Sequence, residues 1–125
     1  MRVLYVDDDR VNSLLFCEIA RLAEGVEVIV AGSAAEAVEL VGGQPPDLLV
    51  LDLHLPDGDG FTLLPRLRQK AGHRVPAFLC SADDPALVEA HARAAGFDDC
   101  WVKPLDVPQV LEVLRRPAPH LARSG

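Results

Sequence analysis

Residues 48–60, LLVLDLHLPDGDG, decide the fold of this chain. They begin with the apolar run Leu48–Leu51 and continue into an acidic loop that contains proline and glycine. A short run that is apolar on both faces is typical of a parallel strand covered by helices on both sides. Asp52 follows at once, so the sequence places a carboxylate at the carboxyl end of a buried strand.

Four other short apolar runs are predicted strands, and helical patterns separate them. The runs are Val3–Val6, Val26–Ala31, Ala77–Cys80 and Cys100–Val102. Strands that alternate with helices through short connections indicate right-handed crossovers. We therefore expect an α/β fold with an open, doubly wound, five-stranded parallel sheet in a single domain.

Two helices carry specific expectations. In the first helix, the spacing of Val11, Leu15, Ile19 and Leu22 predicts one buried face. Pro65 lies in the third predicted helix, where a proline beyond the first turn would remove a backbone hydrogen bond. Pro65 must therefore lie in the first turn of the third helix or else kink it, so we expect this helix to start late.

Composition excludes several classes of protein. The chain has 125 residues and a formal charge of −7, which fits one domain and disfavours direct nucleic-acid binding. No apolar run approaches the ~20 residues of a membrane span, and no signal-peptide core precedes Asp7. Cys17, Cys80 and Cys100 form no C-x-x-C pair. Reduced thiols in a cytoplasmic protein are expected, with a Cys80–Cys100 redox pair as the alternative.

The carboxyl ends of parallel strands meet at one edge of a sheet, where ligands bind. Asp7, Asp8, Asp52, Ser81 and Lys103 all follow predicted strands. Converging carboxylates repel one another unless a cation neutralises them, and an all-oxygen set of ligands favours Mg²⁺. A carboxylate fixed at a strand end can act as a nucleophile, and a lysine and a hydroxyl can hold phosphoryl oxygens. The residues therefore predict Mg²⁺-dependent phosphoryl chemistry on Asp52.

Four motifs resemble the receiver domain of two-component response regulators. They are VDDD (residues 6–9), LDLHLPDGDG (51–60), CSA (80–82) and WVKP (101–104). The resemblance covers residues 1–116 as a receiver domain, with 117–125 as a tail or the start of a linker. It implies the flavodoxin-like strand order 2-1-3-4-5.

The resemblance also implies roles for individual residues. Asp52 would accept a phosphoryl group from phosphohistidine, and Lys103 and Ser81 would contact that group. Mg²⁺ would be held by Asp7, Asp8, Asp52 and the backbone carbonyl of His54. The Lys103–Pro104 bond is often cis in this family.

Partners follow from the same resemblance. A histidine kinase or phosphotransfer protein would supply the phosphoryl group, and the domain would catalyse only its own phosphorylation and dephosphorylation. A downstream protein would bind the face formed by the fourth helix, fifth strand and fifth helix. A phosphorylation-dependent homodimer is a further expectation.

Two residues depart from the expected pattern. Cys100 stands where the family usually has Tyr or Phe, and Trp101 cannot replace that aromatic because successive strand residues point to opposite faces. His54, two residues after Asp52, is expected to alter the lifetime of an aspartyl phosphate.

Two other functions compete with this interpretation. Asp7-Asp8-Asp9-Arg10-Val11 also fits the D-x-D-x-V motif of haloacid-dehalogenase-type hydrolases, in which Asp7 would be the nucleophile and Asp9 the acid/base. The chain could instead be a receiver-like interaction domain that acts without phosphorylation.

Overall fold

The structure, a computed structural model, describes residues 1–116. Five strands form one parallel sheet: β1 (Arg2–Val6), β2 (Glu27–Ala31), β3 (Leu48–Asp52), β6 (Ala77–Ser81) and β7 (Asp99–Val102). Their order is β2-β1-β3-β6-β7. The two-residue strands β4 (His54–Leu55) and β5 (Gly58–Asp59) form a separate antiparallel hairpin. When that hairpin is not counted, the order is 2-1-3-4-5, so the predicted fold class and strand order are confirmed.

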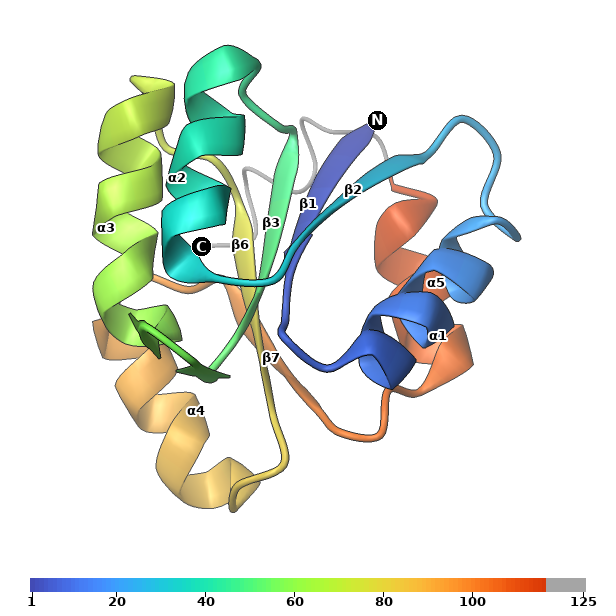
Figure 1. The fold of residues 1–125 in the computed structure, drawn as a ribbon. Coiled ribbons are helices and arrows are strands. Elements are labelled where there is room, and N and C mark those ends of the chain that lie inside the picture. Colours follow the sequence, from blue (N-terminus) through green and yellow to red (C-terminus); the bar gives the residue numbers. More distant parts are fainter. Residues whose placement is uncertain (117–125) are drawn as a thin grey trace.

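Helices cover both faces of the sheet (Figure 1). On one face lie α1 (Arg10–Ala20) and α5 (Val107–Leu114). On the other lie α2 (Ala34–Gly43), α3 (Gly60–Ala71) and α4 (Pro85–Ala94). The side chains of each strand alternate between two apolar layers, so Val3 and Tyr5 face α1 and α5 whereas Leu4 and Val6 face the other helices. Burial on both faces explains why Leu48–Leu51 shows no polar alternation.

Helix α3 does not start late, so the prediction from Pro65 is wrong. The helix begins at Gly60 because Asp59 caps it, with Oδ1 accepting from the backbone N–H of Thr62 at 2.8 Å. Pro65 lies inside the helix, on an exposed position. Water can therefore satisfy the backbone carbonyl whose partner N–H the proline lacks.

The predicted buried face of α1 is also wrong in part. Val11 and Leu22 are exposed, and only Ile19 of the predicted set is fully buried. Phe16 turns inward instead and stacks on the ring of Tyr5, with ring centroids 4.5 Å apart. The large aromatic ring therefore sets the rotation of α1 about its axis, and the apolar side chains of Val11 and Leu14 are left in solvent.

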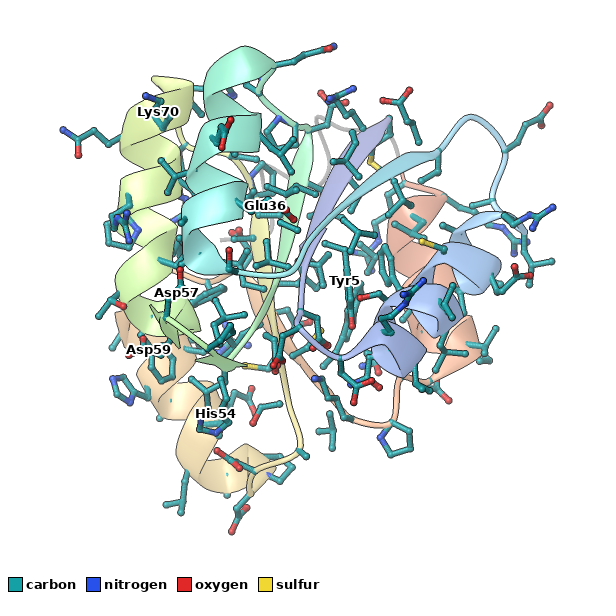
Figure 2. All side chains as sticks on the ribbon, in the orientation of Figure 1. Tyr5, Glu36, His54, Asp57, Asp59 and Lys70 are labelled. Atoms are coloured by element: carbon teal, nitrogen blue, oxygen red, sulfur yellow. The ribbon has the colours of Figure 1, made fainter. Side chains whose placement is uncertain are left out.

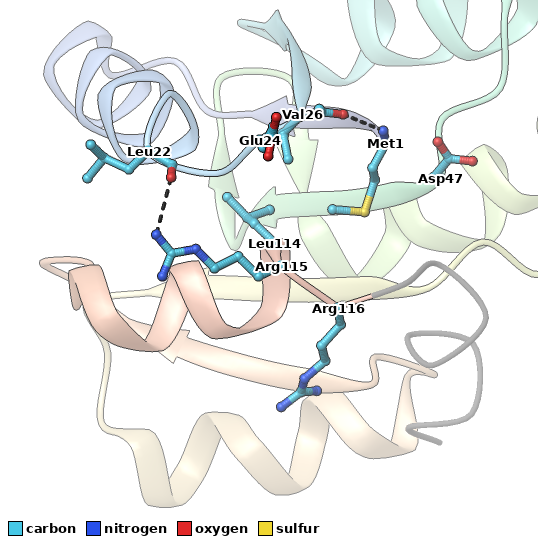
Figure 3. A pocket seen from close by; sticks show the side chains of 9 residues that line it. Met1, Leu22, Glu24, Val26, Asp47, Leu114, Arg115 and Arg116 are labelled. Atoms are coloured by element: carbon cyan, nitrogen blue, oxygen red, sulfur yellow. Dashed lines mark hydrogen bonds between the residues drawn. The ribbon is translucent and has the colours of Figure 1, made fainter.

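A hollow of about 750 Å³ at the amino edge is lined by Met1, Glu24 and Arg115, among others (Figure 3). Arg115 donates there to the carbonyl of Leu22 at 3.2 Å.

No helix within residues 1–116 has both the length and the apolar character needed to cross a membrane. The predicted tail, 117–125, lies outside the described residues.

Candidate functional site

Three carboxylates converge where β1 and β3 end. Asp7 and Asp8 follow β1, and Asp52 is the last residue of β3, the neighbouring strand. Each offers one oxygen, and these three oxygens lie within 4.8 Å of one another. Asp7 and Asp52 are buried, whereas Asp8 is exposed. The chain leaves β1 and β3 in opposite directions across the sheet, so the cluster lies at the switch point where doubly wound folds bind ligands.

Lys103 links the two buried carboxylates. It follows β7, and its Nζ lies 2.9 Å from Asp7 Oδ2 and 3.0 Å from Asp52 Oδ1. Burial alone would lower the pKa of Lys103, but hydrogen bonds to both carboxylates and their charges outweigh it, so the pKa is raised. The Lys103–Pro104 bond is cis, which confirms that expectation. One cation therefore partly neutralises two acids that the fold holds together.

Asp52 binds a proton more readily than an exposed aspartate does. Burial is the main reason its pKa is raised, and the charge of Asp7 adds to the effect. Lys103 opposes both contributions without cancelling them. The folded state therefore favours protonated Asp52, and this contribution to stability is complete below the pKa of an unfolded aspartate. It is lost as the pH rises through the higher folded-state pKa.

The Asp52→Asn variant is therefore expected to be more stable than the wild type at pH 7 in Mg²⁺-free buffer, by about 1 kcal/mol. The difference should shrink as the pH falls and Asp52 of the wild type becomes protonated. Urea unfolding of both proteins at several pH values measures it. A less stable variant at pH 7 would mean that the ion pair with Lys103 outweighs the burial of the charge.

Ser81 ends β6, beside the end of β3. The register pairs Asp52 with Cys80, so Ser81 is one residue further along the neighbouring strand. Its Oγ accepts a hydrogen bond from the backbone N–H of Asp83 at 2.9 Å, and its carbonyl accepts from the N–H of Lys103 at 2.9 Å. The backbone therefore ties the hydroxyl and the ammonium group to the same edge as Asp52.

The side chain of His54 lies on the surface beside this edge (Figure 2). Its Nε2 lies 3.0 Å from Oδ2 of Asp83, two residues beyond Ser81. The contact joins the loop that follows Asp52 to the loop that follows Ser81. Sequence spacing placed His54 near the site but gave no sign of its partner.

Other acidic residues of this edge serve local structure. Asp9 and Asp84 cap α1 and α4. Asp57 accepts from the backbone N–H groups of Ala34 and Ala35 at the start of α2, and these bonds lower the pKa of its carboxyl. The capping of α1 occupies Oδ1 of Asp9, which disfavours the alternative role of Asp9 as an acid/base.

Gly60 permits the close approach of α3 to Asp52. A Cβ atom built at Gly60 would lie 2.8 Å from the backbone carbonyl oxygen of Asp52 and 2.8 Å from a methyl group of Leu79. Real side chains do not tolerate such contacts, so only glycine lets the helix start here. Gly60, the last residue of the stretch 48–60, therefore helps to position the carboxylate of Asp52.

Cys100 and Trp101 point to opposite faces of β7, as expected. Trp101 is buried with Phe78 on the α1/α5 face, whereas Cys100 packs against the other apolar layer. Cys80 shares the layer of Trp101, so Cys80 and Cys100 lie on different faces and do not form the alternative redox pair. Burial raises the pKa of the Cys100 thiol to about 11. A cavity of about 230 Å³ reaches from Cys100 to Ser81.

Tyr5 is a residue of the site that the sequence patterns did not indicate. Its hydroxyl, inside the α1/α5 layer, donates to Asp7 Oδ2 at 3.1 Å. The available signal was a polar aromatic residue in an otherwise aliphatic strand, two positions before Asp7 and therefore on the same face.

Comparison with protein families gives a match to the response regulator receiver domain over residues 3–115. The chain belongs to this family. Transcriptional regulatory protein TrcR of Mycobacterium tuberculosis is 34% identical over 128 residues, covering 100% of this chain and 49% of that protein. Response regulator MprA of Mycobacterium leprae is 34% identical over 121 residues, covering 92% of this chain and 50% of that protein. This receiver domain thus spans about half the length of both relatives.

Solved structures agree with the family match. A putative response regulator from Chloroflexus aurantiacus superposes with a TM-score of 0.85 at 29% identity, covering 98% of each chain. The predicted receiver fold and membership of the response-regulator family are therefore confirmed, and no comparison supports a hydrolase of the haloacid-dehalogenase type.

Proposed function

We propose that this receiver domain accepts a phosphoryl group on Asp52 and signals through the resulting change in shape. The observation that carries the proposal is Lys103 Nζ, held 3.0 Å from Asp52 Oδ1 and 2.9 Å from Asp7 Oδ2 in a cluster of three carboxylates. The arrangement combines a fixed nucleophile with a cation beside it, which suits transfer of an anionic group.

Transfer begins with attack of an Asp52 carboxylate oxygen on phosphorus. The bond between phosphorus and the donor's nitrogen or oxygen breaks, and its electron pair leaves with the donor. Lys103 already contacts Asp52 and can hydrogen-bond the phosphoryl oxygens as negative charge arrives. The Ser81 hydroxyl, whose oxygen accepts from Asp83, keeps its own proton for donation to the same group.

The oxygen-only ligands fit Mg²⁺. Asp7, Asp8 and Asp52, with the backbone carbonyl of His54, would hold the ion. When bound, Mg²⁺ supplies positive charge that offsets the charges of the acceptor carboxylate and the phosphoryl oxygens. Exposed Asp8 gives the ion and its water ligands an entry from solvent.

The test is incubation with acetyl phosphate and Mg²⁺, followed by intact-protein mass measurement. The wild type should gain one phosphoryl group, Asp52→Asn should gain none, and Asp7→Asn should keep the gain. Modification that depends on Asp7 with release of many equivalents of phosphate would instead indicate a hydrolase. An unmodified wild type would indicate an interaction domain that acts without phosphorylation.

His54 is proposed to lengthen the lifetime of the phosphorylated state. Its contact with Asp83 joins the loops on either side of the phosphoryl group, so its removal should admit water more easily. His54→Ala is expected to shorten the half-life of the phosphorylated protein about threefold, as measured by loss of the added mass. His73→Ala, an exposed histidine after α3, is the control; equal decay of His54→Ala and the wild type would reject the role.

We propose a histidine kinase or phosphotransfer protein as the donor and the cytoplasm as the place of the reaction. The proposed output surface consists of α4, β7 and α5, which expose large apolar side chains. These are Leu87, Val102 and Val107. A downstream protein, or a second phosphorylated copy, would bind there. We further propose residues 1–116 as the receiver unit and 117–125 as a tail or linker.

A further inference from the structure

Tyr5 brings a hydroxyl into the acidic site that the proposed transfer does not use. It lies in β1, two residues before Asp7, and is 1% exposed. Its hydroxyl donates to Asp7 Oδ2 at 3.1 Å. The phenol is the donor in this bond, because an ionised carboxylate has lone pairs but no proton to give.

The carboxylate of Asp7 has three donors around it. Oδ2 accepts from Lys103 Nζ at 2.9 Å as well as from Tyr5, and Oδ1 accepts from the backbone N–H of Asp9 at 2.9 Å. The Asp7 side chain is fully buried. Because both oxygens are engaged, rotation of the carboxylate toward a cation would break at least one of these bonds.

The ring of Tyr5 cannot easily follow such a rotation. It stacks on Phe16 of α1 with ring centroids 4.5 Å apart and planes inclined by 13°. Phe16 in turn packs near Trp101, with ring centroids 6.4 Å apart. The stack lies in the close-packed layer between the sheet and α1, so the hydroxyl is fixed in place.

We propose that Tyr5 is a positioning residue whose hydroxyl holds Asp7 Oδ2 against Lys103. The lysine then stays between Asp7 and Asp52, ready for the phosphoryl group, and Asp7 is less available to Mg²⁺. The hydroxyl both withdraws charge from Oδ2 and restrains its rotation. This inference rests on the proposed function of the same site.

The test is Tyr5→Phe, which removes the hydroxyl and keeps the stacked ring. We expect Mg²⁺ to bind more tightly and phosphoryl transfer to become slower. The dissociation constant for Mg²⁺, measured by calorimetry, should fall about fivefold because Asp7 is released to the ion. The rate of phosphorylation by acetyl phosphate at saturating Mg²⁺ should also fall about fivefold because Lys103 is less well placed.

Phe78→Leu is the control, since it disturbs the same apolar layer at Trp101 without removing the donor to Asp7. A purely structural role for Tyr5 predicts weaker Mg²⁺ binding together with slower transfer in both variants, and that result would overturn the inference. In a second outcome, the wild type binds Mg²⁺ and is phosphorylated while Tyr5→Phe keeps the wild-type affinity for Mg²⁺. That result would overturn the role of Tyr5 and leave the proposed function standing. A wild type that neither binds Mg²⁺ nor takes up phosphate would overturn the proposed function and the inference together.

Discussion

Lys103→Met is expected to slow phosphorylation by acetyl phosphate about 100-fold at saturating Mg²⁺. The variant keeps a flexible unbranched side chain but removes the ammonium group that lies 3.0 Å from Asp52 Oδ1. Without that cation, the charge that arrives with the phosphoryl group loses its nearest protein donor. Mg²⁺ should bind about tenfold more tightly, because a positive charge no longer competes for Asp7 and Asp52. Stopped-flow kinetics and calorimetry measure the two effects.

Lys70→Met is the matched control, since the chain has only these two lysines and Lys70 is exposed on α3 (Figure 2). Lys70→Met should leave the rate of phosphorylation and the affinity for Mg²⁺ unchanged. Phosphorylation of Lys103→Met at the wild-type rate would show that the lysine serves only to neutralise the buried carboxylates. The role in transfer would then have to be withdrawn.

Asp98→Ala is expected to destabilise the fold by about 3–5 kcal/mol. The carboxylate is fully buried at the amino edge of the sheet, where it accepts from the N–H of Ala77 at 2.8 Å and from Arg74 at 2.9 Å. It also lies 3.6 Å from the guanidinium of Arg68, whose side chain is largely buried. Burial lowers the pKa of Arg68, whereas the negative charge of Asp98 opposes that effect. Replacing Asp98 with alanine would therefore leave the buried guanidinium without its counter-charge. Urea unfolding at low temperature measures the loss.

Asp99→Ala provides the comparison for this variant. Asp99 is the next residue along the chain, but it is exposed. Among residues 1–116, its carboxylate accepts a hydrogen bond only from the adjacent N–H of Cys100. Its replacement should cost less than about 0.5 kcal/mol. A loss below 1 kcal/mol for Asp98→Ala would contradict its role as the counter-charge of Arg68 and Arg74. Folded Asp98→Ala should bind Mg²⁺ as the wild type does, because the two sites lie at opposite edges of the sheet.

The central residues of the site could be predicted from sequence because a parallel sheet gathers them without fine geometry. Asp7, Asp52, Ser81 and Lys103 each end or follow a strand, and parallel strands present their carboxyl ends at one edge. The structure brings Lys103 against both Asp7 and Asp52, and it places Ser81 beside Asp52. Their proposed roles depend on this convergence.

Contacts between side chains far apart in sequence could not be predicted in the same way. The pairing of His54 with Asp83 depends on how two loops approach each other, and the burial of Asp98 depends on arginines from a different segment. Periodicity failed for α1 because two apolar stripes were available, and only the stacking of Phe16 on Tyr5 selects one. The position of Pro65 misled because the residue is exposed, where water can satisfy the backbone carbonyl whose partner N–H the proline lacks.

Phosphorylation of Asp52 is tested by locating the phosphoryl group on the chain. The wild type is treated with acetyl phosphate and Mg²⁺, the acyl phosphate is reduced with borohydride, and peptides are sequenced by mass spectrometry. We expect a single modified residue, Asp52, recovered as homoserine. Modification at Asp7 or Asp8, or an unmodified chain, would contradict it.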